Sequence, residues 1–166
     1  MFLEKIIFLF IILAFPFFSN AGNLGAGVVL GDPTAITAKY WNSSNTAYDF
    51  GLSFFSGSYV SFYSDYLWHY PGYWKSATNH FVASLTPYVG IGGIVVIAQS
   101  SRANNDHLLG TSSGSLGIGV RVPFGCEWRP TQPPIGVFAE IAPGMSIIPN
   151  TAILVQIGLG VRYYFN

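Results

Sequence analysis

Charged side chains are scarce in this sequence. Aspartate, glutamate, lysine and arginine together make up 8% of its 166 residues, whereas soluble domains carry about a quarter. Seven basic residues balance seven acidic ones, so the chain lacks the positive charge that nucleic-acid binding requires. Because a soluble domain needs charge to stay dissolved, this composition favours a protein that contacts lipid.

Long hydrophobic runs and paired cysteines are also missing. Beyond the N-terminus there is no run of about 18 apolar residues, so transmembrane helices are not expected. The single cysteine, Cys126, excludes an intramolecular disulfide. The chain has instead 51% hydrophobic residues, 17% aromatic residues and 19 glycines, many at alternate positions. High hydrophobicity with little charge and no helical span is typical of a membrane β-barrel.

Residues 1–21 have the features of a secretory signal peptide. Lys5 lies near the start, residues 6–18 are almost wholly apolar, and residues 19–21 form a small-residue cleavage site. The apolar stretch has only about 13 residues, which is short for a membrane span. We expect this segment to be removed, leaving one exported domain over residues 22–166.

Residues 153–166 show the alternation of a membrane-spanning strand most clearly. One face is wholly apolar or aromatic and consists of Ile153, Val155, Ile157, Leu159, Val161, Tyr163 and Phe165. The other face has two glycines, a few polar side chains and one charge, Arg162. A transmembrane barrel strand has this character, with lipid on one side and a packed lumen on the other. The alternative for this segment alone is the last strand of a soluble sheet.

Seven further segments repeat the alternation between turn signals, so eight strands are expected. They cover residues 24–30, 35–41, 47–55, 59–70, 85–98, 115–125 and 135–141. Most approach the roughly 9 to 11 residues that a tilted membrane strand needs, and Gly92-Gly93 indicates a bulge in the fifth. An even number lets both termini lie on the periplasmic side. We therefore predict an all-β fold, an eight-stranded antiparallel transmembrane β-barrel with a side-chain-filled interior.

No charged residue falls on the lipid-facing side of the expected strands. The inward-facing charges are three cations and three anions, namely Lys39, Arg121, Arg162, Asp49, Asp65 and Glu140. Because an unpaired buried charge is costly, we predict that these six form an ion-pair network that plugs the lumen. Its predicted hydrogen-bonding neighbours are Tyr63, Gln156 and Tyr164. A narrow gated pore lined by the same residues is the alternative.

Six short motifs resemble those of a known group of proteins. They are Leu30-Gly31-Asp32-Pro33-Thr34, Lys39-Tyr40-Trp41, Asp65-Tyr66-Leu67-Trp68-His69, Gly119-Val120-Arg121-Val122-Pro123, Glu140-Ile141-Ala142-Pro143-Gly144 and Gly160-Val161-Arg162-Tyr163-Tyr164-Phe165. Together they resemble a poorly characterised family of small outer-membrane barrels of spirochaetes and some predatory Gram-negative bacteria. Its architecture is similar to the OmpA and OmpX type. The resemblance implies location in the bacterial outer membrane, contact with its lipids or lipopolysaccharide, and insertion by the barrel-assembly machinery.

The leading functional prediction is a structural or surface-interaction protein without catalysis, cofactor or metal. The polar segment 99–113 is the candidate site for an unknown surface ligand. An outer-membrane enzyme that modifies lipid, such as a lipid A deacylase or acyltransferase, is the alternative and would need an activated nucleophile. Within the same segment, Asp106, His107 and Ser112 or Ser113 could be recruited, but the His-x-Ser arrangement of the deacylases is absent from the strands.

A soluble lipocalin-like barrel is a third possibility, and it would turn the apolar faces inward. The low charge count argues against it. His69, His80 and His107 lie far apart in the sequence without ligand spacing, so no metal site is predicted.

Overall fold

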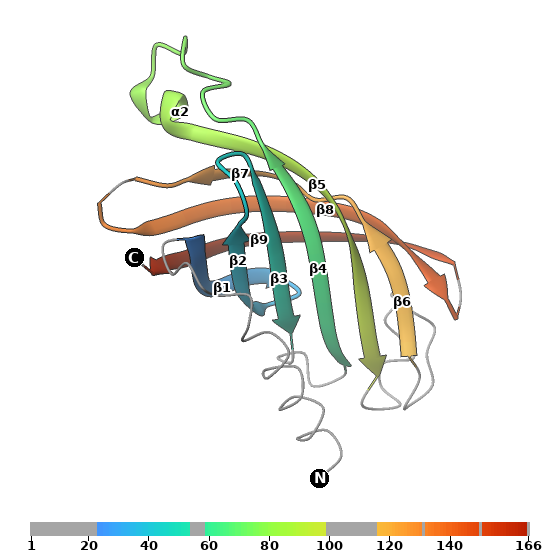
Figure 1. The fold of residues 1–166 in the computed structure, drawn as a ribbon. Coiled ribbons are helices and arrows are strands. Elements are labelled where there is room, and N and C mark those ends of the chain that lie inside the picture. Colours follow the sequence, from blue (N-terminus) through green and yellow to red (C-terminus); the bar gives the residue numbers. More distant parts are fainter. Residues whose placement is uncertain (1–22, 54–58, 99–115, 131, 150, 166) are drawn as a thin grey trace.

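The chain forms a closed antiparallel β-barrel (Figure 1). The computed structural model describes residues 23–53, 59–98, 116–130, 132–149 and 151–165. The expected signal peptide, residues 1–21, and the polar segment 99–113 lie outside these ranges. No helix in the described part of the chain is both long enough and apolar enough to cross a membrane.

The wall of the barrel consists of consecutive antiparallel strands. They are β1 (Leu24–Asp32), β2 (Ala35–Trp41), β3 (Thr46–Ser53), β4 (Tyr59–His69), β5 (Leu85–Ala98), β6 (Leu116–Arg121), β7 (Phe124–Trp128), β8 (Ile135–Ile148) and β9 (Ala152–Phe165). Pairing of β1 with β9 closes the wall. Both β6 and β7 lie between β5 and β8, so they are two halves of one barrel strand. Counted in this way, the described residues form the predicted eight-stranded barrel.

A proline separates β6 from β7 without ending the strand. Pro123 has no N–H to donate, but its carbonyl accepts a hydrogen bond from the Gly90 N–H at 2.8 Å. The preceding residue, Val122, donates to the Pro143 carbonyl at 2.8 Å. The expected strand 115–125 therefore continues to Trp128, three residues beyond the predicted end.

Two other predictions about the strands are corrected by the structure. The expected strand 135–141 continues to Ile148, because β6 and β9 supply partners on both sides of Pro143 and Gly144. The bulge predicted at Gly92-Gly93 is wrong, since pairing with β4 and β6 is regular there. The register shifts instead between Ile118 and Gly119, where β6 pairs with β8.

The connection between β4 and β5 contains a short helix that the sequence analysis did not predict. This helix, α2 (His80–Ser84), begins after Asn79, whose side-chain oxygen accepts hydrogen bonds from the N–H groups of Phe81 and Val82 at 2.8 and 3.4 Å. Five residues are too few for a periodic apolar pattern, so only the capping residue could have indicated it.

Successive side chains alternate between the outside and the inside of the wall. On β9, Ile153 and Leu159 are 83% and 63% exposed, whereas Arg162 is 1% exposed. The apolar faces thus point outward, which is the reverse of a lipocalin-like barrel. The register advances by about ten residues in one circuit, which tilts the strands by about 40° and leaves a narrow interior.

Large aromatic side chains fill much of this interior by lying against glycines. Each of four inward-facing aromatic residues stands opposite a glycine of the neighbouring strand, in the pairs Tyr63–Gly51, Tyr88–Gly125, Phe138–Gly160 and Tyr164–Gly25. A Cβ atom on any of these glycines would overlap the opposite ring. Close packing in the lumen therefore explains why glycine recurs on the inward faces.

Candidate functional site

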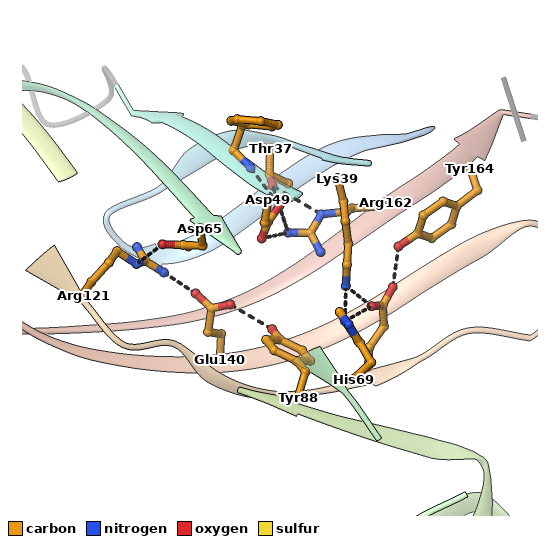
Figure 2. A network of polar contacts seen from close by, with 12 residues as sticks. Thr37, Lys39, Asp49, Asp65, His69, Tyr88, Arg121, Glu140, Arg162 and Tyr164 are labelled. Atoms are coloured by element: carbon orange, nitrogen blue, oxygen red, sulfur yellow. Dashed lines mark hydrogen bonds and ion pairs between the residues drawn. The ribbon is translucent and has the colours of Figure 1, made fainter. Parts of the chain in front are cut away.

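Charged side chains from most of the strands converge in the lumen, where they form three groups (Figure 2). All but one of these side chains are almost completely buried, and Glu140 is 10% exposed. The alternation of the strands points them inward, and the neighbouring glycines leave space for them.

The central group joins β9 to β3 across the lumen. The Nη2 atom of Arg162 donates to both carboxylate oxygens of Asp49, at 2.8 and 2.6 Å, and to the Thr37 hydroxyl at 2.9 Å. The same hydroxyl donates to Asp49 at 3.2 Å. The guanidinium group lies over the Phe138 ring, 3.7 Å from its centroid. Arg162 thus forms charge-assisted hydrogen bonds to Asp49 and a cation–π contact with Phe138.

A second group surrounds Arg121 of β6. Arg121 forms an ion pair with Glu140 of β8 and donates to the side-chain oxygen of Gln156 at 2.7 Å. Its Nε atom lies 3.3 Å from Asp65 of β4. These two side chains meet over Gly92 of the intervening strand, where a Cβ would overlap the Asp65 carboxylate.

Aromatic side chains complete the Arg121 group. The guanidinium carbon of Arg121 lies 4.1 Å from the centroid of the Tyr63 ring. Tyr88 donates its hydroxyl hydrogen to Glu140 at 2.9 Å. The Glu140 carboxylate therefore has a cationic partner and a neutral one.

The third group lies nearer the end of the barrel where β9 finishes, which we call the C-terminal end. Here Lys39 of β2 forms an ion pair with Glu127 of β7, and its Nζ lies 2.8 Å from His69 Nε2. Tyr164 donates to the other Glu127 oxygen at 2.5 Å. Lys39 Nζ also lies 4.7 Å from the centroid of the Trp41 ring.

All six residues of the predicted network lie inside the barrel, but they do not form one cluster. Asp49 pairs with Arg162, and Arg121 contacts both Asp65 and Glu140. Lys39 pairs with none of the predicted anions. Of the predicted neighbours, Gln156 and Tyr164 form hydrogen bonds to the groups, whereas Tyr63 packs its ring against Arg121.

Glu127 is the ion-pair residue that the sequence analysis missed. The expected strand ended at Gly125, so no face was assigned to residues beyond it. Continuing the alternation from Arg121 by steps of two through Pro123 and Gly125 reaches Glu127, which is inward-facing and 2% exposed. The signal was missed because the strand was expected to end at Gly125, whereas pairing with β5 and β8 continues to Trp128. Tyr88 was missed as well, although the same alternation along β5 places it inward.

The chemistry of these groups is mutual neutralisation. Among the described residues, four carboxylates and three cations face the lumen, the carboxylates being Asp49, Asp65, Glu127 and Glu140 and the cations Lys39, Arg121 and Arg162. Neither oxygen of Asp65 accepts a hydrogen bond within the described residues. His69 is contacted by the Lys39 ammonium group at Nε2. Within the described ranges, no three His, Cys, Asp or Glu side chains are grouped so that they could hold a metal ion.

The outer surface differs between the two ends of the barrel. At the C-terminal end, the outward-facing side chains include an aromatic set, Tyr48, Tyr66, Trp68, Trp128, Tyr163 and Phe165. Neighbouring rings in this set lie 5.0 to 5.5 Å apart between centroids. Towards the opposite end, where β1 turns into β2, the exposed apolar side chains include Leu30, Ile36, Ile97, Leu116, Ile147 and Ile153. Tyr and Trp favour a membrane–water boundary, and aliphatic side chains favour its hydrocarbon core.

Comparison with solved structures shows the fold of small outer-membrane barrels. The N-terminal β-barrel domain of Pseudomonas aeruginosa OprF matches with a TM-score of 0.57 and 16% identity, over 86% of this chain and 95% of that one. A designed transmembrane β-barrel matches with a TM-score of 0.51 and 19% identity, over 87% and 97%. The Neisserial surface protein NspA gives a TM-score of 0.48 and 12% identity, over 86% and 93%.

Comparison by sequence gives one family. The family described as "Protein of unknown function (DUF3996)" matches residues 18–165. No curated protein matches the chain. The predicted resemblance to small outer-membrane barrels is therefore confirmed at the level of fold, and the predicted occurrence in spirochaetes and predatory bacteria stays a prediction.

Proposed function

The chain belongs to the DUF3996 family of proteins of unknown function, and we propose that it is an outer-membrane barrel with a closed lumen that acts through its surface, without catalysis. The observation that carries this proposal is the separation of charge from apolar surface. The ion-paired side chains of the strands point inward, and the outer wall is a band of exposed apolar side chains.

The apolar outer wall supports a lipid environment. In water, soluble monomers rarely expose contiguous apolar patches larger than a few hundred Å², whereas this band includes outward-facing residues from β1 to β9. In lipid the same side chains contact hydrocarbon, and every described strand of the closed wall is paired on both sides. Outer-membrane lipids are accordingly the first proposed partner, with the barrel-assembly machinery acting during insertion.

The contents of the lumen support a closed barrel in preference to a gated pore. Passage of an ion would require the Arg162–Asp49 contact or the Arg121 group to open, and removing one partner from a buried pair costs about 3 to 5 kcal/mol. Nearer the opposite end of the barrel, an apolar cluster of Tyr63, Ile94 and Leu154 also obstructs the lumen. The network thus serves as a polar core that stabilises the barrel.

The same contacts favour a surface role over lipid modification. The lumen carboxylates and His69 bind neighbouring side chains, so they are not arranged around a nucleophile. The proposed binding surface is then the outer wall together with the connections, including the polar segment 99–113. Lipid A that stays unmodified when the protein is overproduced is the expected result, and a change in its acyl chains would favour the enzyme.

Membrane fractionation followed by electrophoresis tests the central proposal. We expect the protein in the outer-membrane fraction, with a mobility that changes only when the sample is boiled, because a closed barrel resists detergent. A soluble band without a heat shift would reject the proposal. In planar bilayers the closed lumen predicts no large steady conductance, and such a conductance would reject the closed state while leaving the barrel intact.

A further inference from the structure

The connection between β4 and β5, residues 70–84, stands outside the barrel wall at the C-terminal end (Figure 1). It exposes several aromatic side chains. Tyr73 is 71% exposed and Phe81 is 57% exposed, and Tyr70 is also exposed. These side chains do not enter the lumen, so the packing of the barrel does not account for them.

The segment holds these aromatic side chains in place by local hydrogen bonds. Successive turns are closed by the N–H of Tyr73 to the Tyr70 carbonyl at 3.3 Å and by the N–H of Ala77 to the Trp74 carbonyl at 2.9 Å. Asn79 caps α2. Because the backbone is ordered in this way, the exposed rings lose little further conformational entropy when they contact a partner.

The exposed rings extend the aromatic set of the outer wall. Phe81 lies 6.1 Å from Trp128 between ring centroids, and Tyr73 lies 5.5 Å from Trp74. The segment also begins two residues after Trp68 of β4, which faces outward. Aromatic side chains on the wall and on the connection therefore belong to one belt at the same end of the barrel.

The connections at this end carry net positive charge. The three connections at the C-terminal end, residues 42–45, 70–84 and 129–134, contain Lys75 and Arg129 but no aspartate or glutamate. Lys75 is exposed, and its carbon chain lies over Gly72, where a Cβ would overlap it. Aromatic rings combined with basic side chains and no acidic ones match the headgroup layer of an anionic membrane, which accepts rings at its boundary and attracts cations.

We propose that residues 70–84 lie in the anionic headgroup layer of the lipid leaflet that surrounds the C-terminal end of the barrel. Tyr73 and Phe81 insert at the boundary between headgroups and acyl chains, and Lys75 contacts lipid phosphates. This inference rests on the proposed function, because it requires the barrel to be in a membrane. It makes the connection a lipid-binding segment that holds the barrel at a defined depth.

An environment-sensitive label placed in the segment tests the proposal. The full chain, with Cys126→Ser and Ser76→Cys, is labelled with a nitrobenzoxadiazole dye and folded into vesicles of equimolar phosphatidylcholine and phosphatidylglycerol. We expect blue-shifted emission and strong quenching by lipids that carry a nitroxide on the headgroup. Both signals should fall when Tyr73 and Phe81 are changed to serine. Thr78→Ser, in the same exposed segment, is the matched control and should change neither.

The charge is tested separately with Lys75→Gln. One basic side chain near an anionic surface contributes an attraction equivalent to about a fivefold change in equilibrium. We therefore expect the ratio of headgroup-bound to water-exposed label to fall about fivefold in this variant. In vesicles of phosphatidylcholine alone, the variant and the parent should give the same ratio.

Flotation and the electrophoretic heat shift, measured on the same samples, separate the two proposals. If the barrel floats with vesicles and shifts on heating, but the label emits as in water, the inference is wrong and the segment is free to contact a soluble partner. If the barrel does not float, the proposed function fails as well. A label that stays quenched after the Tyr73 and Phe81 changes would also reject the assigned contacts.

Discussion

Replacing Asp49 by asparagine should destabilise the barrel far more than the same change at Asp65. The side chain of Asp49 accepts two hydrogen bonds from Arg162, at 2.6 and 2.8 Å, and both residues are almost completely buried. With the amide in place, the other described groups in direct contact with Arg162, the Thr37 hydroxyl and the Phe138 ring, are neutral, and the carboxylate of Glu127 is paired with Lys39. A buried charge left without its partner costs about 3 to 5 kcal/mol.

Asp65 is the matched control, because it stands directly opposite Asp49 on the neighbouring strand and is equally buried. Its loss leaves Arg121 with Glu140 and with the hydrogen bond to Gln156. The change also removes a like charge opposite Asp49, which is unfavourable on adjacent strands. We expect Asp65→Asn to lower the free energy of unfolding clearly less than Asp49→Asn, because Arg121 keeps a carboxylate partner.

Urea unfolding in lipid vesicles measures both variants, with tryptophan emission and the unheated electrophoretic shift as signals. A third variant, Asp49→Asn with Arg162→Met, removes both charges of the pair and should recover at least half of the loss. Equal destabilisation by the two asparagine variants would refute the assignment of separate groups. So would a double variant as unstable as Asp49→Asn alone, because the cost would then not come from the isolated arginine.

Three further changes test the packing of the wall. Gly51→Ala should lower the free energy of unfolding by about 1 to 3 kcal/mol, because its Cβ would overlap the Tyr63 ring. The control Gly93→Ala, whose Cβ would meet nothing closer than 3.7 Å, should lower it clearly less. Equal urea midpoints for the two variants would contradict this packing. Leu159→Arg should lower stability in bilayers by about 2 to 4 kcal/mol, and a neutral effect there would argue against lipid at this face. Tyr164→Phe should lower the free energy of unfolding by about 1 kcal/mol, because it removes one hydrogen-bond donor from Glu127, which keeps Lys39 as its cationic partner. A loss of stability as large as that of Asp49→Asn would show that the hydroxyl has a further role.

The alternation of side chains predicted most of the wall because a strand imposes a local period of two. The bounds of β5 agree with the expected residues 85–98, and the inward positions of Lys39, Asp49 and Arg162 follow from the same period. Three strands extend beyond their expected ends, β1 to Asp32, β7 to Trp128 and β8 to Ile148, and a proline, Pro143, lies within the extension of β8. A proline removes one hydrogen-bond donor, but the neighbouring strands decide whether pairing continues beyond it.

Which charges pair with one another could not be predicted from the sequence. Which side chains face inward is a property of each strand, but which cation meets which anion depends on the tilt and register of the closed wall. Lys39 and Glu127 are 88 residues apart, and Arg162 and Asp49 are 113 apart. For this reason the six residues of the predicted network lie in three groups. Lys39 pairs with Glu127, which was not among the predicted anions.

The sequence by itself determined the class of fold, the inner and outer faces of the expected strands and the buried charges other than Glu127, because each of these follows from local periodicity and composition. Only the tertiary structure decided that strand pairing continues through residues 126–128 and 142–148 and how the charges pair across the lumen. Closure also brought the aromatic side chains of separate strands and of residues 70–84 to one end of the barrel. These features depend on contacts between segments far apart in the chain, and closure of the barrel is the step that brings them together.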